Sequence, residues 1–152
     1  MPATDLEAKA ILELKNNDLM AALEVAQAQL NTLYTRAQVL MSLAGIVVTV
    51  TGFSGRLIAG TSPSAQAFLI AGLFVSLASA IYIFVKVMRL RWVTVLLAED
   101  RANALTNALK RRDAKTRAFA VGGSILFVGL TLYCISIALM LMAPEALQVP
   151  VR

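Results

Sequence analysis

The chain has 152 residues, of which 59% are hydrophobic and 15% are charged, and its formal net charge at neutral pH is +5. Soluble domains average about 45–50% apolar and about 25% charged residues, so this composition argues against an ordinary soluble domain. The absence of histidine removes the usual neutral-pH acid–base group and the commonest transition-metal ligand.

Residues 1–36 predict a long amphipathic, coiled-coil-like helix. No glycine or proline interrupts residues 3–44, and leucine and alanine recur there at alternating spacings of four and three. In heptad numbering Asn16 takes an a position, where asparagine fixes register and strand number. The seam predicted for self-association is Leu12, Asn16, Leu19, Leu23, Leu30 and Leu33. Packing of this face on the chain's own 86–117 loop is the alternative.

Three apolar segments are long enough to cross a hydrocarbon core of ~30 Å, which takes about 20 helical residues. They cover residues 37–60, 65–87 and 118–142, and Pro63 favours a turn before the second. Small residues recur within them at helical spacings, which lets helices approach closely in lipid. The predicted packing residues are Ser42, Gly45, Thr49, Gly52, Gly72, Ser76, Gly122 and Gly129.

The segment 88–117, between the second and third apolar segments, predicts a basic helical loop because it contains neither glycine nor proline. It either forms a helical hairpin against the N-terminal helix or lies on the membrane surface. Clustered basic side chains attract anionic lipid headgroups. The candidate headgroup ligands are Lys110, Arg111, Arg112, Lys115 and Arg117.

The distribution of basic residues predicts the orientation of the chain. Nine Lys and Arg residues lie between residues 86 and 117, and three more precede residue 37. Short basic loops stay on the cytoplasmic side of a membrane. We therefore expect a multi-pass protein of a plasma membrane or bacterial inner membrane, with a cytoplasmic N-terminus and a short external tail, 143–152.

Together these patterns predict an all-α integral membrane protein with three transmembrane helices. Its long N-terminal cytoplasmic helix is expected to continue into the first span, and a helical cytoplasmic loop joins the second and third spans. The continuity is expected because the heptad pattern of residues 12–44 passes residue 36 without a change of phase.

The sequence contains no paired carboxylates, metal-ligand cluster, phosphate-binding glycine loop or nucleophile beside a base. We therefore expect no enzymatic activity, no cofactor and no metal. The expected partners are the lipid bilayer and further copies of the chain, and not nucleic acid. The leading hypothesis is a membrane scaffold that self-assembles through its N-terminal helix and its small-residue faces.

The alternative is an oligomeric channel or pore-forming effector gated by the cytoplasmic helices. A cytoplasmic helix joined to short spans is similar in layout to small transmembrane effectors of bacterial antiphage signalling systems. The resemblance covers the arrangement of segments, and it implies a pore as the activity. Ser42, Thr49 and Gly52 give a partial polar stripe along the first span.

Overall fold

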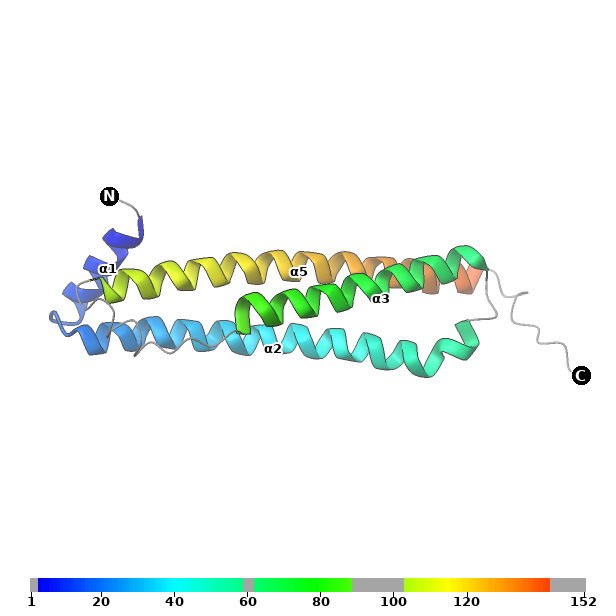
Figure 1. Cartoon of the computed structure of the whole chain (residues 1–152), viewed down its shortest axis with the longest axis horizontal. Coiled ribbons are helices and arrows are strands. Elements are labelled where there is room, and N and C mark those ends of the chain that lie inside the picture. The colour runs from blue at the N-terminus through cyan, green and yellow to red at the C-terminus, as the bar shows by residue number, and fades with distance from the viewer. Residues whose placement is uncertain (1–2, 59–61, 89–102, 143–152) are drawn as a thin grey trace, which may run out of the picture.

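The computed structural model describes residues 3–58, 62–88 and 103–142. These residues form helices α1 (Ala3–Leu14), α2 (Leu19–Ile58), α3 (Pro63–Ile83) and α5 (Ala104–Met142), with a π-helical turn η1 (Phe84–Met88) after α3 (Figure 1). Three segments are long and apolar enough to span a membrane: Leu19–Ser54, Pro63–Met88 and Ala104–Met142. The predicted class, an all-helical protein with three such helices, is confirmed for the described part of the chain.

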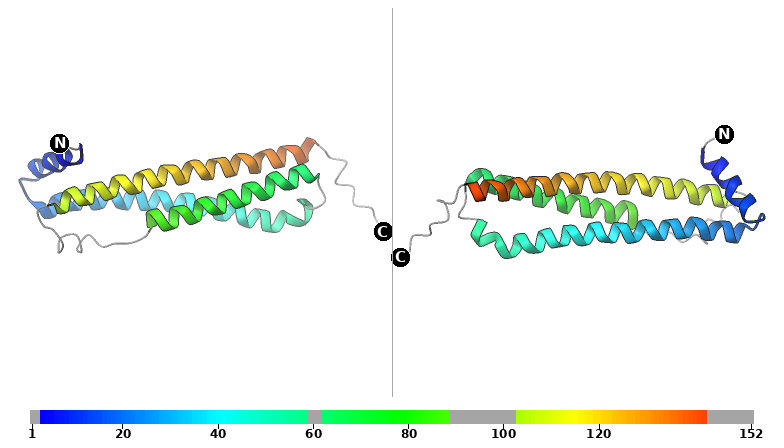
Figure 2. Two further views of the ribbon diagram at one scale, coloured as in Figure 1. Left: turned by 45° about the horizontal axis from the view of Figure 1, so that its top comes forward. Right: turned by 180° about the vertical axis from the view of Figure 1, so that it is seen from behind.

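The helices form an elongated bundle. Figures 1 and 2 show α2 and α5 side by side and running in the same direction, with α1 across the end where both begin. Helix α3 runs antiparallel to both and packs most extensively against α5. Since α3 with η1 covers only the second part of α5, the bundle has two helices at one end and three along the rest.

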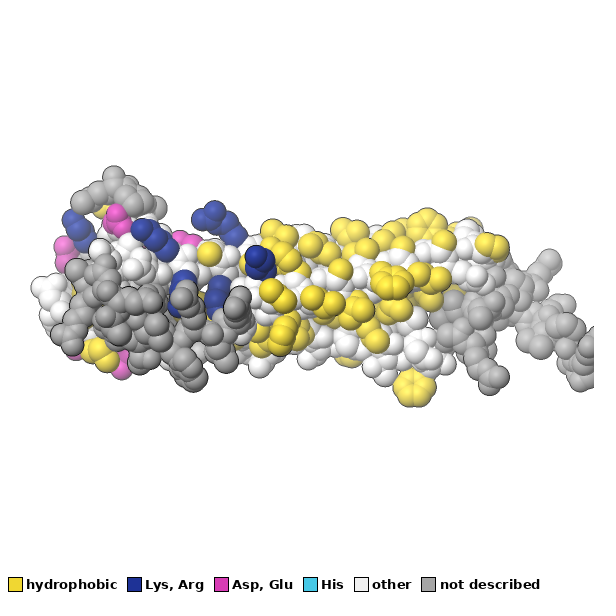
Figure 3. All heavy atoms as spheres, in the orientation of Figure 1, with side chains coloured by type: hydrophobic (Ala, Val, Ile, Leu, Met, Phe, Trp, Pro, Cys, Tyr) yellow, Lys and Arg dark blue, Asp and Glu magenta, His cyan; other side chains and the backbone are white. Residues whose placement is uncertain are grey.

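Charge and hydrophobicity divide the bundle along its length. We call residues 3–36 and 103–117 the charged end, because most of the described charged side chains lie there (Figure 3). The remaining surface is largely hydrophobic, and the side chains of Phe53, Phe74 and Phe127 are 87%, 66% and 75% exposed. Exposed apolar surface of this extent is typical of contact with lipid.

Helix length supports the same division. The 40 residues of α2 correspond to about 60 Å of helix, about twice the thickness of a hydrocarbon core. About half of α2 must therefore project beyond the lipid. The charged half, Leu19–Arg36, is the half that water solvates at lower cost.

The prediction of one helix across residues 1–36 and the first span is wrong at residues 15–18. Asn16 and Asn17 adopt the left-handed conformation, with φ of 53° and 61°. The Asn17 amide donates to the Leu12 carbonyl at 2.8 Å and the Asn16 amide to the Glu13 carbonyl at 3.2 Å. This pair of bonds is the Schellman motif that closes a helix C-terminus, and asparagine tolerates its left-handed position. Asn16 therefore ends α1 and does not sit in a helical seam.

Helix α2 starts independently of α1. The Asp18 carboxylate accepts the amides of Met20 and Ala21 at 2.9 and 3.2 Å, which satisfies two of the unpaired donors at the helix start. From Leu19 onward the helix continues to Ile58 without interruption. Continuity into the first span therefore holds for residues 19–36 and fails for α1.

Of the other boundaries, the start of α3 agrees with the prediction and the start of α5 does not. Helix α3 begins at Pro63, as the turn at Pro63 predicted, and the Ser62 hydroxyl accepts the Ala65 amide at 3.4 Å as its cap. Residues 104–117 do not form a separate loop helix, because α5 runs through position 118 unbroken. The remainder of the predicted loop, residues 89–102, and the tail 143–152 lie outside the described residues.

Candidate functional site

The tightest contact in the bundle joins α3 to α5 through small residues. A Cβ atom on Gly129 would lie 2.5 Å from the Ser76 hydroxyl oxygen, and one on Gly72 would lie 2.9 Å from the Gly129 carbonyl oxygen. A Cβ on Gly122 would overlap the side chain of Ile83. The predicted packing residues Gly72, Ser76 and Gly129 therefore meet each other within one chain, and Gly122 of α5 packs against Ile83 of α3.

Serine hydroxyls cross-link the same two helices. Ser79 donates to the Gly122 carbonyl and Ser136 donates to the Ala65 carbonyl, each at 2.6 Å, and both serines are fully buried. Ser76 is buried against Gly129, and its hydroxyl has no hydrogen-bond partner among the described residues. In lipid such inter-helix bonds add to close packing, since the hydrophobic effect does not drive helices together there.

The small-residue stripe of α2 is arranged differently, because nothing in the described chain covers it. Ser42, Gly45, Thr49 and Gly52 are all exposed. A Cβ atom on Gly45 or Gly52 would meet no atom within 4 Å. The Thr49 hydroxyl donates to the Gly45 carbonyl at 2.9 Å and so is satisfied within its own helix. Of the three small stripes, that of α2 is therefore the open one.

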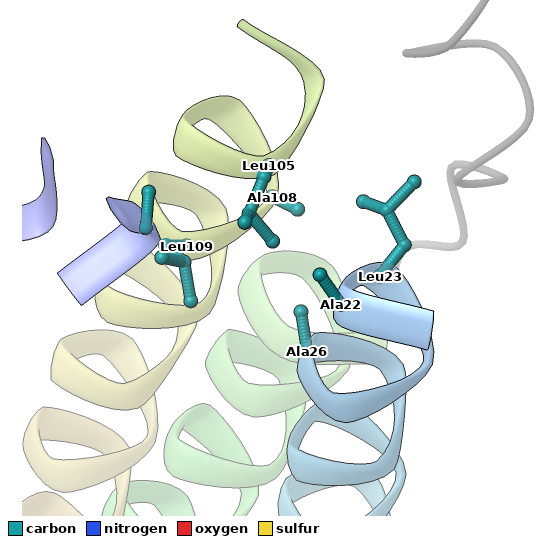
Figure 4. Close-up of a cluster of buried hydrophobic side chains, with 7 residues drawn as sticks. Ala22, Leu23, Ala26, Leu105, Ala108 and Leu109 are labelled. Carbon is teal, nitrogen blue, oxygen red and sulfur yellow. The ribbon is translucent and has the colours of Figure 1, made fainter. Parts of the chain in front are cut away.

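The seam predicted for self-association is used inside the chain. Leu23 is buried in a cluster with Ala22 and Ala26 of α2 and with Leu105, Ala108 and Leu109 of α5. Figure 4 shows these α2 and α5 side chains at the facing sides of the two helices. Ala8 of α1 completes the cluster, and the seam residues Leu12 and Leu19 pack against it.

Closer to the apolar section, Leu33 and Ala37 of α2 are buried with Ile83 and Val87. Leu30 between the two clusters is also buried. The heptad face from Leu19 to Leu33 is thus occupied by α1, α3, α5 and η1. Its assignment as a seam between copies is corrected, and the alternative of packing within the chain describes residues 104–109.

Arg112 joins three elements of the charged end. Its Nη1 and Nη2 atoms donate to the two carboxylate oxygens of Glu7 at 2.5 and 2.8 Å, and Nη1 also donates to Gln29 at 2.9 Å. Nε and Nη2 donate to Asp113 at 2.9 and 2.7 Å. These bonds use all of the N–H donors of a guanidinium group. Arg112 therefore fixes α1 on α2 and α5.

The electrostatics of this network agree with its geometry. The hydrogen bond from Arg112 lowers the pKa of Glu7; burial opposes this shift, and the positive charge of Arg112 adds to it. The hydrogen bond to Glu7 raises the pKa of Arg112 above its already high ordinary value. Both groups stay ionised near neutral pH. Because Glu7 and Asp113 neutralise Arg112, this residue does not fit the predicted role of lipid headgroup ligand.

Lys115 has a second internal role at the boundary between the charged end and the apolar section. Its Nζ atom donates to the Tyr34 hydroxyl at 2.6 Å and to the Val87 carbonyl at 2.8 Å, and it lies 4.6 Å from the centre of the Tyr34 ring. Val87 lies in η1, the last turn of this helical segment. Carbonyls at a helix C-terminus lack helical partners, so a cation is favourable there. Lys110 and Arg117 are exposed and Arg111 is half-buried, so these three remain candidate headgroup ligands.

A shallow cleft of about 310 Å³ lies between α2 and α5 beside Arg112. Its lining residues are Gln29, Thr32, Leu33, Arg36, Arg112 and Thr116. The Thr32 and Thr116 hydroxyls donate to the carbonyls one turn earlier in their own helices. The other cationic side chain of the cleft is Arg36, and its donors make no hydrogen bond to the described residues. One guanidinium without further donors does not make a specific anion site.

The contacts that organise the charged end were not predicted. The ion pair of Glu7 with Arg112 joins residues 105 positions apart, and no local sequence pattern predicts such a pair. No group of three or more His, Cys, Asp or Glu side chains in the described ranges could hold a metal ion. The described side chains thus provide contacts between helices, and we find no constellation among them suited to a covalent reaction.

The three apolar helices and the exposed hydrophobic surface around them define a multi-pass membrane protein. Comparisons of the chain with protein-family models, with curated proteins and with solved structures found no match.

Proposed function

We propose that this chain is a non-enzymatic membrane protein that assembles with further copies of itself through the open small-residue face of α2. Ser42, Gly45, Thr49 and Gly52 form this face. The assembly would act as a membrane scaffold that holds several charged ends in one layer. Self-assembly through the leucine seam is no longer part of the proposal, since that seam is covered within the chain.

The observation that carries the proposal is the contrast between the glycines of α2 and those of α3 and α5. Gly72, Gly122 and Gly129 each have a neighbouring helix where a side chain would stand, whereas Gly45 and Gly52 have open space. Glycine within a helix costs about 0.5–1 kcal/mol relative to alanine, and close contact with another helix offsets that cost. A second α2 helix would provide the contact for Gly45 and Gly52.

Substitution of the open glycines tests the assembly. We expect Gly45→Leu with Gly52→Leu to weaken association by about tenfold or more, which corresponds to at least about 1.4 kcal/mol. The fold of each chain should be retained, because a Cβ atom at either position would meet no atom within 4 Å. Native mass in lipid nanodiscs and energy transfer between labelled copies in vesicles both measure the change.

The matched control is Ala138→Leu, which adds a similar bulk to an exposed position of α5. It should leave the association unchanged. A wild-type protein that is monomeric in vesicles at every protein-to-lipid ratio would contradict the proposal. So would equal weakening by the control and the α2 variant.

Orientation is proposed from the basic residues of the charged end. In a Cys134→Ala background, a cysteine at the exposed position Glu13 or Lys110 should be protected from an impermeant maleimide in intact cells. A cysteine at the exposed position Ser64, in the first turn of α3, should react. Protection disappears for all positions when the membrane is permeabilised. Reaction of position 110 in intact cells would reverse the orientation.

A channel is the competing function, and no described contact favours it. The buried hydroxyls of Ser79 and Ser136 donate to backbone carbonyls in the close contact between α3 and α5. Conductance across liposomes that contain the oligomer separates the two functions. A scaffold leaves the membrane impermeable to ions, and a pore does not.

A further inference from the structure

Helix α1 is joined to the rest of the chain as a separable unit. The linker of residues 15–18 contains two consecutive left-handed residues, Asn16 and Asn17. The Schellman bonds to Leu12 and Glu13 close α1, and the Asp18 carboxylate caps α2. Because each helix is capped by its own residues, α1 can leave its position without unwinding α2.

The surface that α1 covers combines an apolar part with one cationic group, which suits a short amphipathic helix with one carboxylate. Its apolar part is Leu23, Leu105 and Leu109 with the alanines between them, and Ala8 of α1 is buried there. Its polar part is Arg112, which Asp113 and Gln29 already hold in place for the two oxygens of Glu7. A helix that brings the same apolar residues and the same carboxylate would bind equally well.

The α1 of a second copy is such a helix. Residues 15–18 span up to about 14 Å when extended, which is the reach of α1 away from its own chain once the Schellman bonds open. Confinement of several copies in one membrane assembly raises the local concentration of neighbouring α1 helices. Exchange of an identical element between copies remakes the contacts of α1 with α2 and α5, and only the hydrogen bonds of the linker change.

We propose that neighbouring copies exchange α1, so that Glu7 of one copy pairs with Arg112 of the next and its Ala8 face fills the next copy's cluster. This inference depends on the proposed assembly, which brings the copies together. It assigns the charged end a linking function: the α2 face associates the spans, and the exchanged α1 fastens each copy to its neighbour.

The test uses two full-length chains that differ in their tags and both carry Cys134→Ala. One chain carries Ala8→Cys on α1 and the other carries Ala108→Cys on α5, two positions of the same buried cluster. The chains are produced together and treated in membranes with a short flexible bis-maleimide. We expect a covalent heterodimer. The double variant Ala8→Cys with Ala108→Cys in one chain verifies that the reagent bridges the two positions.

Three control variants show whether the heterodimer arises from exchange of α1. Ala10→Cys, on the exposed side of α1, replaces Ala8→Cys and should give only the yield of random encounters. Glu7→Arg added to the Ala8→Cys chain should abolish the heterodimer, because two guanidinium groups then repel each other. Arg112→Glu in the Ala108→Cys chain should restore it by reversing the pair.

Cross-linking confined to the double variant, at monomer mass, would overturn the exchange. The mass of the untreated wild type then distinguishes a failure of the exchange alone from a failure of the α2 assembly as well. An oligomer without the heterodimer overturns the exchange and leaves the α2 assembly in place, whereas a monomer overturns both. A heterodimer that persists with Glu7→Arg alone would also contradict the proposal, because the ion pair would then have no part in the linkage.

Discussion

Gly129→Ala is expected to lower the free energy of unfolding by about 1–3 kcal/mol, the usual cost of overpacking a close contact. The added Cβ would lie 2.5 Å from the Ser76 hydroxyl oxygen, 2.9 Å from the Ser76 amide nitrogen and 3.1 Å from the Gly72 carbonyl oxygen. Two of these three atoms belong to the backbone, so no side-chain rotation removes the overlap. Helix α3 must move away from α5, which also lengthens the Ser79 and Ser136 hydrogen bonds.

The control is Gly45→Ala, the same chemical change at the open face of α2. It should leave the unfolding free energy of an isolated chain unchanged or raise it by up to about 1 kcal/mol, since alanine is the better helix former. Reversible unfolding in mixed micelles, followed by circular dichroism, measures both variants. Equal effects of the two substitutions would mean that the close approach of α3 and α5 does not contribute to stability.

The sequence was sufficient to predict the apolar spans and the start of α3. Composition and segment length dictate the spans, because few other structures accommodate long uncharged runs. Pro63 after Ser62 predicts a helix start for a local reason, the fixed φ of proline and the cap provided by serine. Features that depend on a few neighbouring residues or on overall hydrophobicity could thus be predicted from the sequence.

The break after α1 was predictable in principle and was missed. The absence of glycine and proline suggested an unbroken helix, yet the Asn16–Asn17–Asp18 run contains both signals of a boundary. Asparagine is the residue after glycine that best tolerates a left-handed helix end, and aspartate is among the best helix caps. The heptad spacing of leucine and alanine runs through residues 15–18 in the sequence and therefore did not mark the break.

The partner of the leucine seam could not be predicted in the same way. A stripe of leucine and alanine buries equally well against a second copy or against another helix of its own chain. The choice depends on Leu105 and Leu109, about 80 residues later in the sequence, and on how α5 is placed. The internal role of Arg112 is also non-local, since its partners Glu7 and Gln29 lie at the other end of the chain.

The division into a charged end in water and an apolar section in lipid has an energetic consequence at two leucines of α5. Leu109, in the charged end, is 0% exposed, and Leu126, in the apolar section, is 2% exposed. Removing a buried leucine side chain in water loses both the transfer free energy and the packing contacts. In lipid the transfer contribution vanishes, because the surrounding tails are as apolar as the leucine itself.

We therefore expect Leu109→Ala to lower the unfolding free energy by about 2–5 kcal/mol and Leu126→Ala by only about 1–2 kcal/mol, although both side chains are equally buried. The measurement compares both variants with the wild type in the same lipid bicelles, with denaturant unfolding followed by circular dichroism. Equal losses at the two positions would place both leucines in the same medium. The lipid boundary would then not separate residues 103–117 from the rest of α5, and the orientation argued from the basic residues would lose its support.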